Sequence, residues 1–146
     1  MPTVTVAETV AAAGEPIYAV LNNLSAFPQF MKNVQSVTII ERGEGYTHSR
    51  WVVKLQGATF SWTERDDFFP DAGRIAYHQI EGDLKTFEGY WQLEPDLDKT
   101  RVILETTFEF GMPMLAGLLN PVAKLALREN ARAMIRAIGE QVARPL

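Results

Sequence analysis

The central half of the chain consists of short strand-like segments joined directly by turns, with no helical segment between them. Strands spaced this closely pair as antiparallel neighbours, because a parallel connection needs a crossover of about a dozen residues or more. Gly, Pro and Asp residues mark the turns between the predicted strands, which cover residues 34–42, 46–55, 58–69, 74–80, 85–94 and 100–110. The chain is therefore predicted to form an antiparallel meander.

One strand and two short helical segments are predicted before this meander. Residues 3–10 alternate apolar and polar side chains, as a half-buried strand does. Pro16 suits the first turn of a helix, and apolar residues recur at helical spacing up to Leu24. The segment 25–28 should break this helix, and residues 29–32 are predicted to form one further helical turn.

The last third of the chain has the pattern of helices. Pro113 is predicted to open a short helix through Leu119, and Asn120 to cap a second helix that begins at Pro121. The second helix would run to about residue 143, roughly 34 Å at 1.5 Å per residue. Its apolar side must pack against the sheet, the large apolar partner available. That side consists of Ala123, Leu127, Ala131, Met134, Ile135, Ile138 and Val142.

These elements predict an α+β fold in which a seven-stranded antiparallel sheet wraps around one long C-terminal helix, with two short helices after the first strand. The 146 residues suit a single domain over residues 1–146. A formal charge of −4 argues against electrostatic binding of nucleic acid. The absence of cysteine excludes disulfides, cysteine-ligated zinc and a thiol nucleophile.

Other sequence signals also narrow the function. The two histidines, His48 and His78, have no acidic residues at metal-ligand spacing, so neither a metal site nor a cofactor is predicted. The N-terminus is too polar for a signal peptide and no apolar run reaches about 18 residues. A cytoplasmic location is therefore expected.

Two motifs carry a family resemblance that covers essentially the whole chain. Residues 81–91, EGDLKTFEGYW, and residues 107–110, TFEF, resemble the coenzyme-Q-binding START proteins. These belong to the helix-grip (SRPBCC) superfamily of START domains and bacterial polyketide cyclases. The resemblance implies a helix-grip fold and a cavity for a lipophilic small molecule, but it does not fix an activity.

The aromatase/cyclases of aromatic polyketide synthesis give a sharper chemical comparison. The sequence at 62–65, Trp-Thr-Glu-Arg, resembles their Trp-X-X-Arg motif, which implies a cavity role for Arg65. The same resemblance places Thr63 at a cavity serine and Asn130 at a cavity asparagine. A tyrosine of that group falls on Val34 here, so a phenol of the proton relay is missing.

Two orientations of the strand 58–69 are open. If Arg65 faces the cavity, as the resemblance favours, Thr63 and Ser61 do too, and Phe60 and Trp62 form an exposed patch suited to a dimer. Hydrophobicity alone favours the reverse, with Trp62 buried and Arg65 in solvent, where neighbouring acidic side chains would pair with it.

The candidate ligand contacts are inward-facing strand residues and residues of the helices. Inward-facing strand residues of this kind more often form a core than contact a ligand, but in a sheet closed over a single helix the inner layer forms both core and cavity wall. The apolar segment 112–119 is a lid, a membrane-touching flap or simple packing. The candidates are Phe30, Trp51, Ser61, Thr63, Arg65, His78, Phe87, Trp91, Leu104, Phe108, Leu115, Leu119, Leu127, Asn130 and Met134.

The leading hypothesis is a carrier or chaperone that holds an isoprenoid quinone, lipid or polyketide-like molecule between sheet and helix, touching membranes transiently. The alternative is a polyketide cyclase, aromatase or dehydratase in which Arg65 stabilises an enolate and Thr63 helps to move protons. Whether the protein is an enzyme is left open. A third hypothesis is a homodimer subunit that acts through Phe60, Trp62 and the segment 112–125.

Overall fold

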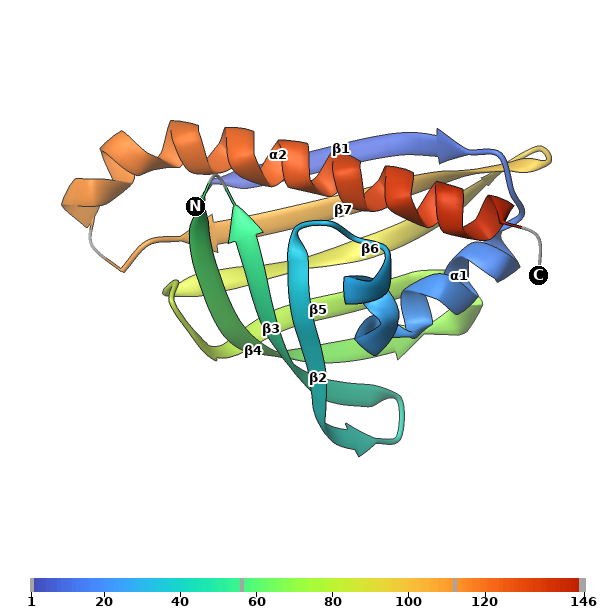
Figure 1. Cartoon of the computed structure of the whole chain (residues 1–146), viewed down its shortest axis with the longest axis horizontal. Helices are drawn as coiled ribbons and strands as arrows, with labels where there is room; N and C mark the ends of the chain where they lie inside the picture. The colour runs from blue at the N-terminus through green and yellow to red at the C-terminus, as the bar shows by residue number, and fades with distance from the viewer. Residues whose placement is uncertain (1, 56, 112, 145–146) are drawn as a thin grey trace.

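The computed structural model describes residues 2–55, 57–111 and 113–144, with the backbone alone described for 113–118. One sheet curves around one long helix, and two short helices close an end (Figure 1). The strands run antiparallel in the order β1-β7-β6-β5-β4-β3-β2. They are β1 (Thr3–Val10), β2 (Val34–Gly43), β3 (Tyr46–Leu55), β4 (Ala58–Phe69), β5 (Arg74–Gly82), β6 (Thr86–Asp96) and β7 (Lys99–Glu109). The predicted seven-stranded sheet is confirmed.

The short helices after β1 differ in detail from the prediction. They are α1 (Gly14–Asn22) and a 3₁₀ helix, η1 (Leu24–Gln29), while η2 (Pro70–Ala72) is a single turn between β4 and β5. The predicted break at 25–28 is wrong because this segment is itself the second helix, with Pro28 inside it. Such a short helix leaves several backbone amides unpaired, so the missing N–H of proline costs little there.

The helix α2 (Pro113–Ala143) is continuous, which corrects the prediction of two helices. Pro121 lies inside it, and the Oδ1 atom of Asn120 accepts no hydrogen bond among the described residues, so the predicted cap does not form. Packing of the apolar side against the sheet outweighs the one backbone hydrogen bond that proline removes.

The core lies between the concave face of the sheet and the second half of α2. Ile135 and Ile138 are fully buried there, against a cluster that includes Val6, Val102 and Trp91. The helix α1 closes one end, where Ile17 and Leu21 join the same cluster. The predicted apolar side of α2 is confirmed, because each of its members belongs to this core or packs against it.

A close approach of two strands explains one residue of the 81–91 motif. A Cβ atom at Gly89 would overlap the carbonyl of Glu105 on β7 and would lie 2.8 Å from the Tyr77 hydroxyl. The missing side chain lets that hydroxyl donate a hydrogen bond to the Glu105 carbonyl oxygen, at 3.1 Å. None of the helices among the described residues is long and apolar enough to cross a membrane.

Candidate ligand cavity

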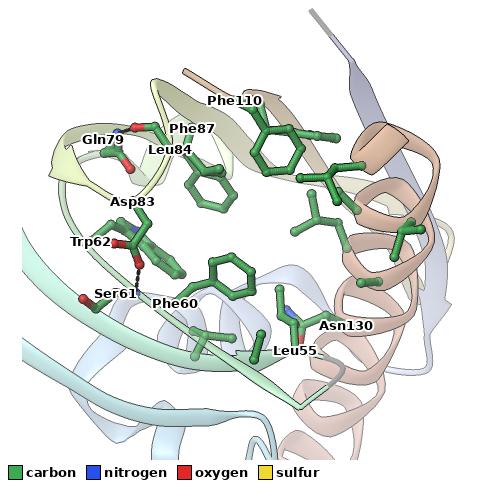
Figure 2. A pocket seen from close by; sticks show the side chains of 18 residues that line it. Leu55, Phe60, Ser61, Trp62, Gln79, Asp83, Leu84, Phe87, Phe110 and Asn130 are labelled. Atoms are coloured by element: carbon green, nitrogen blue, oxygen red, sulfur yellow. Dashed lines mark hydrogen bonds between the residues drawn. The ribbon is translucent and has the colours of Figure 1, made fainter. Parts of the chain in front are cut away.

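The first half of α2 stands away from the sheet and leaves a cavity of about 380 Å³ between them (Figure 2). Its wall is formed by the strands β3 to β7, the β5–β6 turn and α2. The apolar lining residues are Val53, Leu55, Ala58, Phe60, Trp62, Leu84, Phe87, Phe108, Phe110, Leu119, Val122, Ala123, Ala126 and Leu127, and the polar ones are Ser61, Gln79, Asp83 and Asn130. We call this space the main cavity.

A second, smaller space of about 60 Å³ adjoins the main cavity toward the core, and we call it the inner pocket. The two spaces share Val53, Trp62, Phe87, Leu127 and Asn130 in their walls. The inner pocket is further lined by Trp51, Glu64, Tyr77, Trp91, Leu104, Thr106, Ala131 and Met134. An apolar chamber thus leads to a smaller one that contains several polar groups.

Aromatic rings form the wall where the two spaces meet. The Trp62 ring centroid lies 4.9 Å from that of Phe87, which in turn lies 5.9 Å from the Tyr77 ring. The contact between Trp62 and Phe87 joins β4 to β6 across the curve of the sheet. Such a wall offers flat apolar surface to a ring system or an unsaturated chain.

Trp62 lines the cavity and Arg65 lies on the opposite, outer face of the sheet, which settles the orientation of β4. The Arg65 Nε atom donates a hydrogen bond to Asp67 Oδ1 at 3.0 Å, and its guanidinium stacks over the Tyr46 ring at 4.1 Å. Thr63 is also on the outer face, where it accepts a hydrogen bond from Arg50 at 3.3 Å. The prediction that Arg65 and Thr63 face the cavity is wrong.

The physical reason is the cost of removing a guanidinium from water. On the outer face Arg65 keeps part of its hydration and pairs with a carboxylate, while Phe60 and Trp62 remove apolar surface from water on the inner face. The expected exposed patch of Phe60 and Trp62 therefore does not exist, because both residues line the main cavity.

A buried polar network lies behind the inner pocket. Glu64, 4% exposed, accepts a hydrogen bond from Trp62 Nε1 at 2.7 Å and is hydrogen-bonded to Asp66, 1% exposed. Asp66 Oδ2 in turn accepts hydrogen bonds from Thr47 at 2.8 Å and Ser49 at 2.5 Å. The Ser49 hydroxyl also accepts one from Trp51 Nε1, at 2.8 Å.

Burial raises the pKa of Glu64 well above its ordinary value, and the neighbouring Asp66 raises it further. The raised pKa favours the neutral acid form of Glu64, in which its proton lies in the hydrogen bond with Asp66. Burial likewise raises the pKa of Tyr77, which stays a phenol. The polar groups beside the inner pocket include hydroxyls and the carboxyl group of Glu64.

Ten of the fifteen candidate ligand contacts line one of the two spaces. Ser61, Phe87, Phe108, Leu119, Leu127 and Asn130 line the main cavity, and Trp51, Trp91, Leu104 and Met134 line the inner pocket. The side chain of Ser61 points away from the cavity in Figure 2, and its hydroxyl accepts a hydrogen bond from Arg50 at 3.5 Å. The side chain of Leu115 lies outside the described residues.

Two further candidates do not line either space. Phe30 packs edge-on against Phe27, with ring centroids 5.9 Å apart, and belongs to the core periphery. His78 is exposed on the outer face of the sheet, where it pairs with Arg65 in the ladder between β4 and β5.

Sequence reasoning missed several lining residues. Phe60, Trp62 and Glu64 share one face of β4, in the orientation that hydrophobicity alone favoured and the motif resemblance did not. The turn residues Asp83 and Leu84 carry no comparable signal. Asp83 accepts a hydrogen bond from the backbone N–H of Ser61 at 2.9 Å, which ties the β5–β6 turn to the cavity wall (Figure 2).

The curved sheet, the enclosed long helix and the apolar cavity between them define a START-like helix-grip ligand-binding domain. A family model described as polyketide cyclase / dehydrase and lipid transport matches residues 10–135. The chain therefore belongs to this polyketide cyclase/dehydrase and lipid transport family.

Two curated relatives have different names. The chain is 26% identical over 129 residues to the actinorhodin polyketide synthase bifunctional cyclase/dehydratase of Streptomyces coelicolor. This match covers 87% of the chain but only 40% of that protein, so the chain spans about two fifths of its length. The chain is also 24% identical over 107 residues to the ribosome association toxin RatA of Vibrio cholerae, covering 73% of the chain and 74% of the toxin.

Solved structures show the same fold. TTHA0849 of Thermus thermophilus superposes with a TM-score of 0.90 at 28% identity, over 97% of both chains. The ZhuI aromatase/cyclase of a Streptomyces species has a TM-score of 0.86 at 24% identity, over 97% of this chain and 93% of its own. A START superfamily protein of Mycobacterium smegmatis has a TM-score of 0.81 at 21% identity, over 96% of both chains. The likeness to the last two shows the fold alone.

Proposed function

We propose that the protein binds a lipophilic small molecule, such as an isoprenoid quinone, a lipid or a polyketide-like compound, and carries it in the main cavity. The observation that supports this most is the wall itself, in which apolar and aromatic side chains greatly outnumber polar ones. Transfer of apolar surface from water into such a space contributes about 25 cal/mol per Å² buried. The few polar side chains would orient the ligand rather than hold it.

Exposed apolar side chains in and beside the wall of the main cavity support loading from an apolar phase. Leu119 and Val122 line the cavity and are 39% and 60% exposed, and Leu125, one turn further along α2, is 53% exposed. These side chains would contact a lipid surface transiently while a ligand moves between the membrane and the cavity.

A cyclase or dehydratase activity is the second candidate, and the similarity to the Streptomyces coelicolor cyclase/dehydratase favours it. Arg65 does not reach the cavity, so an arginine-based mechanism has no support. A proton transfer would use Glu64, Tyr77 or Thr106 at the inner pocket, or Asp83 at the main cavity.

The carrier hypothesis is tested by extracting the protein purified from native cells with organic solvent and identifying the extract by mass spectrometry. A stoichiometric lipid, quinone or polyketide is expected. Titration with a fluorescent apolar probe gives an independent measure, with Ala123→Phe as the variant that fills the cavity.

The matched control is Ala133→Phe, on an exposed position of the same helix outside the cavity wall. Ala123→Phe should weaken probe binding at least tenfold, and Ala133→Phe should leave it unchanged. Equal binding by both variants would contradict the proposed site. Conversion of a β-hydroxy ketone polyketide analogue by the empty protein would favour the enzyme.

A further inference from the structure

The inner pocket has a chemical character of its own, because four of its lining side chains carry oxygen atoms. Glu64, Tyr77 and Thr106 come from β4, β5 and β7, and Asn130 of α2 faces them across the pocket. A volume of about 60 Å³ suits a small polar group at the end of a larger molecule. At roughly 30 Å³ per water molecule, it would also hold about two waters.

The hydrogen-bonding capacity left on Glu64 is that of an acceptor. An ionised carboxylate only accepts, and in the neutral form that the raised pKa favours the single proton of Glu64 lies in the hydrogen bond with Asp66. Its Oε1 atom accepts one hydrogen bond, from Trp62 Nε1 at 2.7 Å, and keeps a further lone pair. Glu64 therefore has no proton to offer to a ligand while this network is intact.

Thr106 is also left as an acceptor. The Tyr77 hydroxyl has a single proton, which it donates to the Glu105 carbonyl oxygen at 3.1 Å. In the 2.5 Å contact between the Tyr77 and Thr106 hydroxyls, Thr106 must then be the donor. The proton of Thr106 is thus used, and the lone pairs of its oxygen stay available on the pocket side.

The amide of Asn130 is engaged as well. Its Oδ1 atom accepts a hydrogen bond from Asn33 and its Nδ2 atom donates to the Met134 sulfur, both at 3.4 Å. Within the described residues Asn130 uses one of its two amide N–H groups, so the pocket offers acceptor oxygens from the sheet and one remaining donor from α2.

We infer that the inner pocket selects a ligand by a terminal hydroxyl group, an alcohol, phenol or enol, which donates its hydrogen bond to Glu64 or Thr106 while the apolar body of the ligand fills the main cavity. This inference rests on the proposed ligand-binding function and narrows it. A ketone, ether or carboxylate in the same place can accept only from Asn130 and leaves its oxygen facing those of Glu64 and Thr106, whereas a hydroxyl both donates and accepts, so the hydroxyl is favoured.

The test uses three probes of one ring system: 2-naphthol, 2-methoxynaphthalene and naphthalene, titrated by calorimetry at pH 7 into the ligand-free protein. We expect 2-naphthol to bind about tenfold more tightly than 2-methoxynaphthalene, whose oxygen is an acceptor only. The Thr106→Val and Glu64→Met variants should each lower this ratio several-fold. Glu64→Gln should retain it, because its amide still donates to Asp66 and its carbonyl still accepts.

The ratio of the affinities for 2-naphthol and 2-methoxynaphthalene distinguishes a contact with the hydroxyl from a general change in packing. A change in packing would alter the affinities for all three probes by a similar factor. If Glu64→Met fails to fold, Thr106→Val alone decides. Binding of naphthalene and 2-methoxynaphthalene with no advantage for 2-naphthol would overturn the inference and leave the proposed function standing. In that case the inner pocket would hold water and not a group of the ligand. Failure of all three probes to bind would contradict the proposed function itself.

Discussion

Trp51 and Trp62 stack on each other across β3 and β4, with ring centroids 5.8 Å apart and planes 7° from parallel. They are direct partners in the strand ladder, so the register of this hairpin sets the stack. Through Ser49 and Glu64, each indole N–H also joins the buried network around Asp66. The aromatic wall and the polar network are therefore held by the same pair of side chains.

The first prediction is a fluorescence change on ligand binding. All three tryptophans of the chain, Trp51, Trp62 and Trp91, line the inner pocket. A ligand there replaces water beside the indoles, so emission should shift or be quenched in proportion to occupancy. The Trp62→Phe variant should lose a large part of the signal. Saturable binding by calorimetry without any change in emission would place the ligand elsewhere.

The second prediction is that Arg65→Ala leaves ligand affinity within about twofold of that of the unaltered protein. Its guanidinium faces away from the cavity and pairs with Asp67 near the surface. A pair of this kind contributes about 0–1 kcal/mol to the free energy of unfolding. Arg101→Ala, which breaks the exposed pair with Glu94, is the matched control for both measurements. A tenfold loss of affinity in Arg65→Ala alone would show that the residue acts in the site.

The third prediction concerns the pH dependence of stability. The pKa of Glu64 is higher in the folded protein than in the unfolded chain, where it is close to 4.5. Unfolding above that pH releases the proton, so the contribution of Glu64 is fully present below about pH 4.5 and falls as the pH rises toward the folded-state pKa. The slope is at most about 1.4 kcal/mol per pH unit.

Urea unfolding between pH 4.5 and 8 measures this effect as the difference between the unaltered protein and Glu64→Gln. The difference should change with pH, because glutamine does not titrate. The exposed Glu81→Gln serves as control and should give a constant difference. A constant difference for Glu64→Gln as well would show that the carboxyl is already ionised in the folded state.

The fourth prediction is that Pro121→Ala stabilises the protein by about 1–3 kcal/mol. Pro121 is exposed and lies inside α2, where it removes a backbone hydrogen bond to the carbonyl of residue 117. The midpoint temperature of thermal unfolding and the helical circular dichroism signal should both increase. Pro70→Ala, at the start of η2 where no such bond is lost, should not stabilise the protein. A destabilised Pro121→Ala would mean that the proline shapes the helix for packing.

The architecture could be predicted because the turns and the apolar periodicity act locally. Gly43 to Gly45 and Pro70 to Gly73 close hairpins wherever the rest of the chain lies, so strand number and antiparallel order follow. The continuity of α2 could not be predicted from the sequence, because Pro121 is a strong local signal for a helix break. The contacts with the sheet that compensate for it are made by residues distant in sequence.

The site was predicted less well for a related reason. The sequence motif favoured Arg65 on the inner face, whereas the free-energy cost of desolvating its charge favoured Trp62 there. The desolvation cost determined the orientation. Glu64 was overlooked because adjacent acidic residues are normally hydrated. Its burial depends on the hydroxyls of Thr47 and Ser49, which reach Asp66 only after β3 has paired with β4.

The helix α2 has two unlike halves. The half around Ile135 and Ile138 is fixed in the core, whereas the half around Ala123 and Leu127 borders empty space. Substitutions in the second group change the dimensions of the chamber without touching the residues that hold the fold together. Ligand specificity can therefore change through point mutations in a few turns of one helix while the fold is conserved.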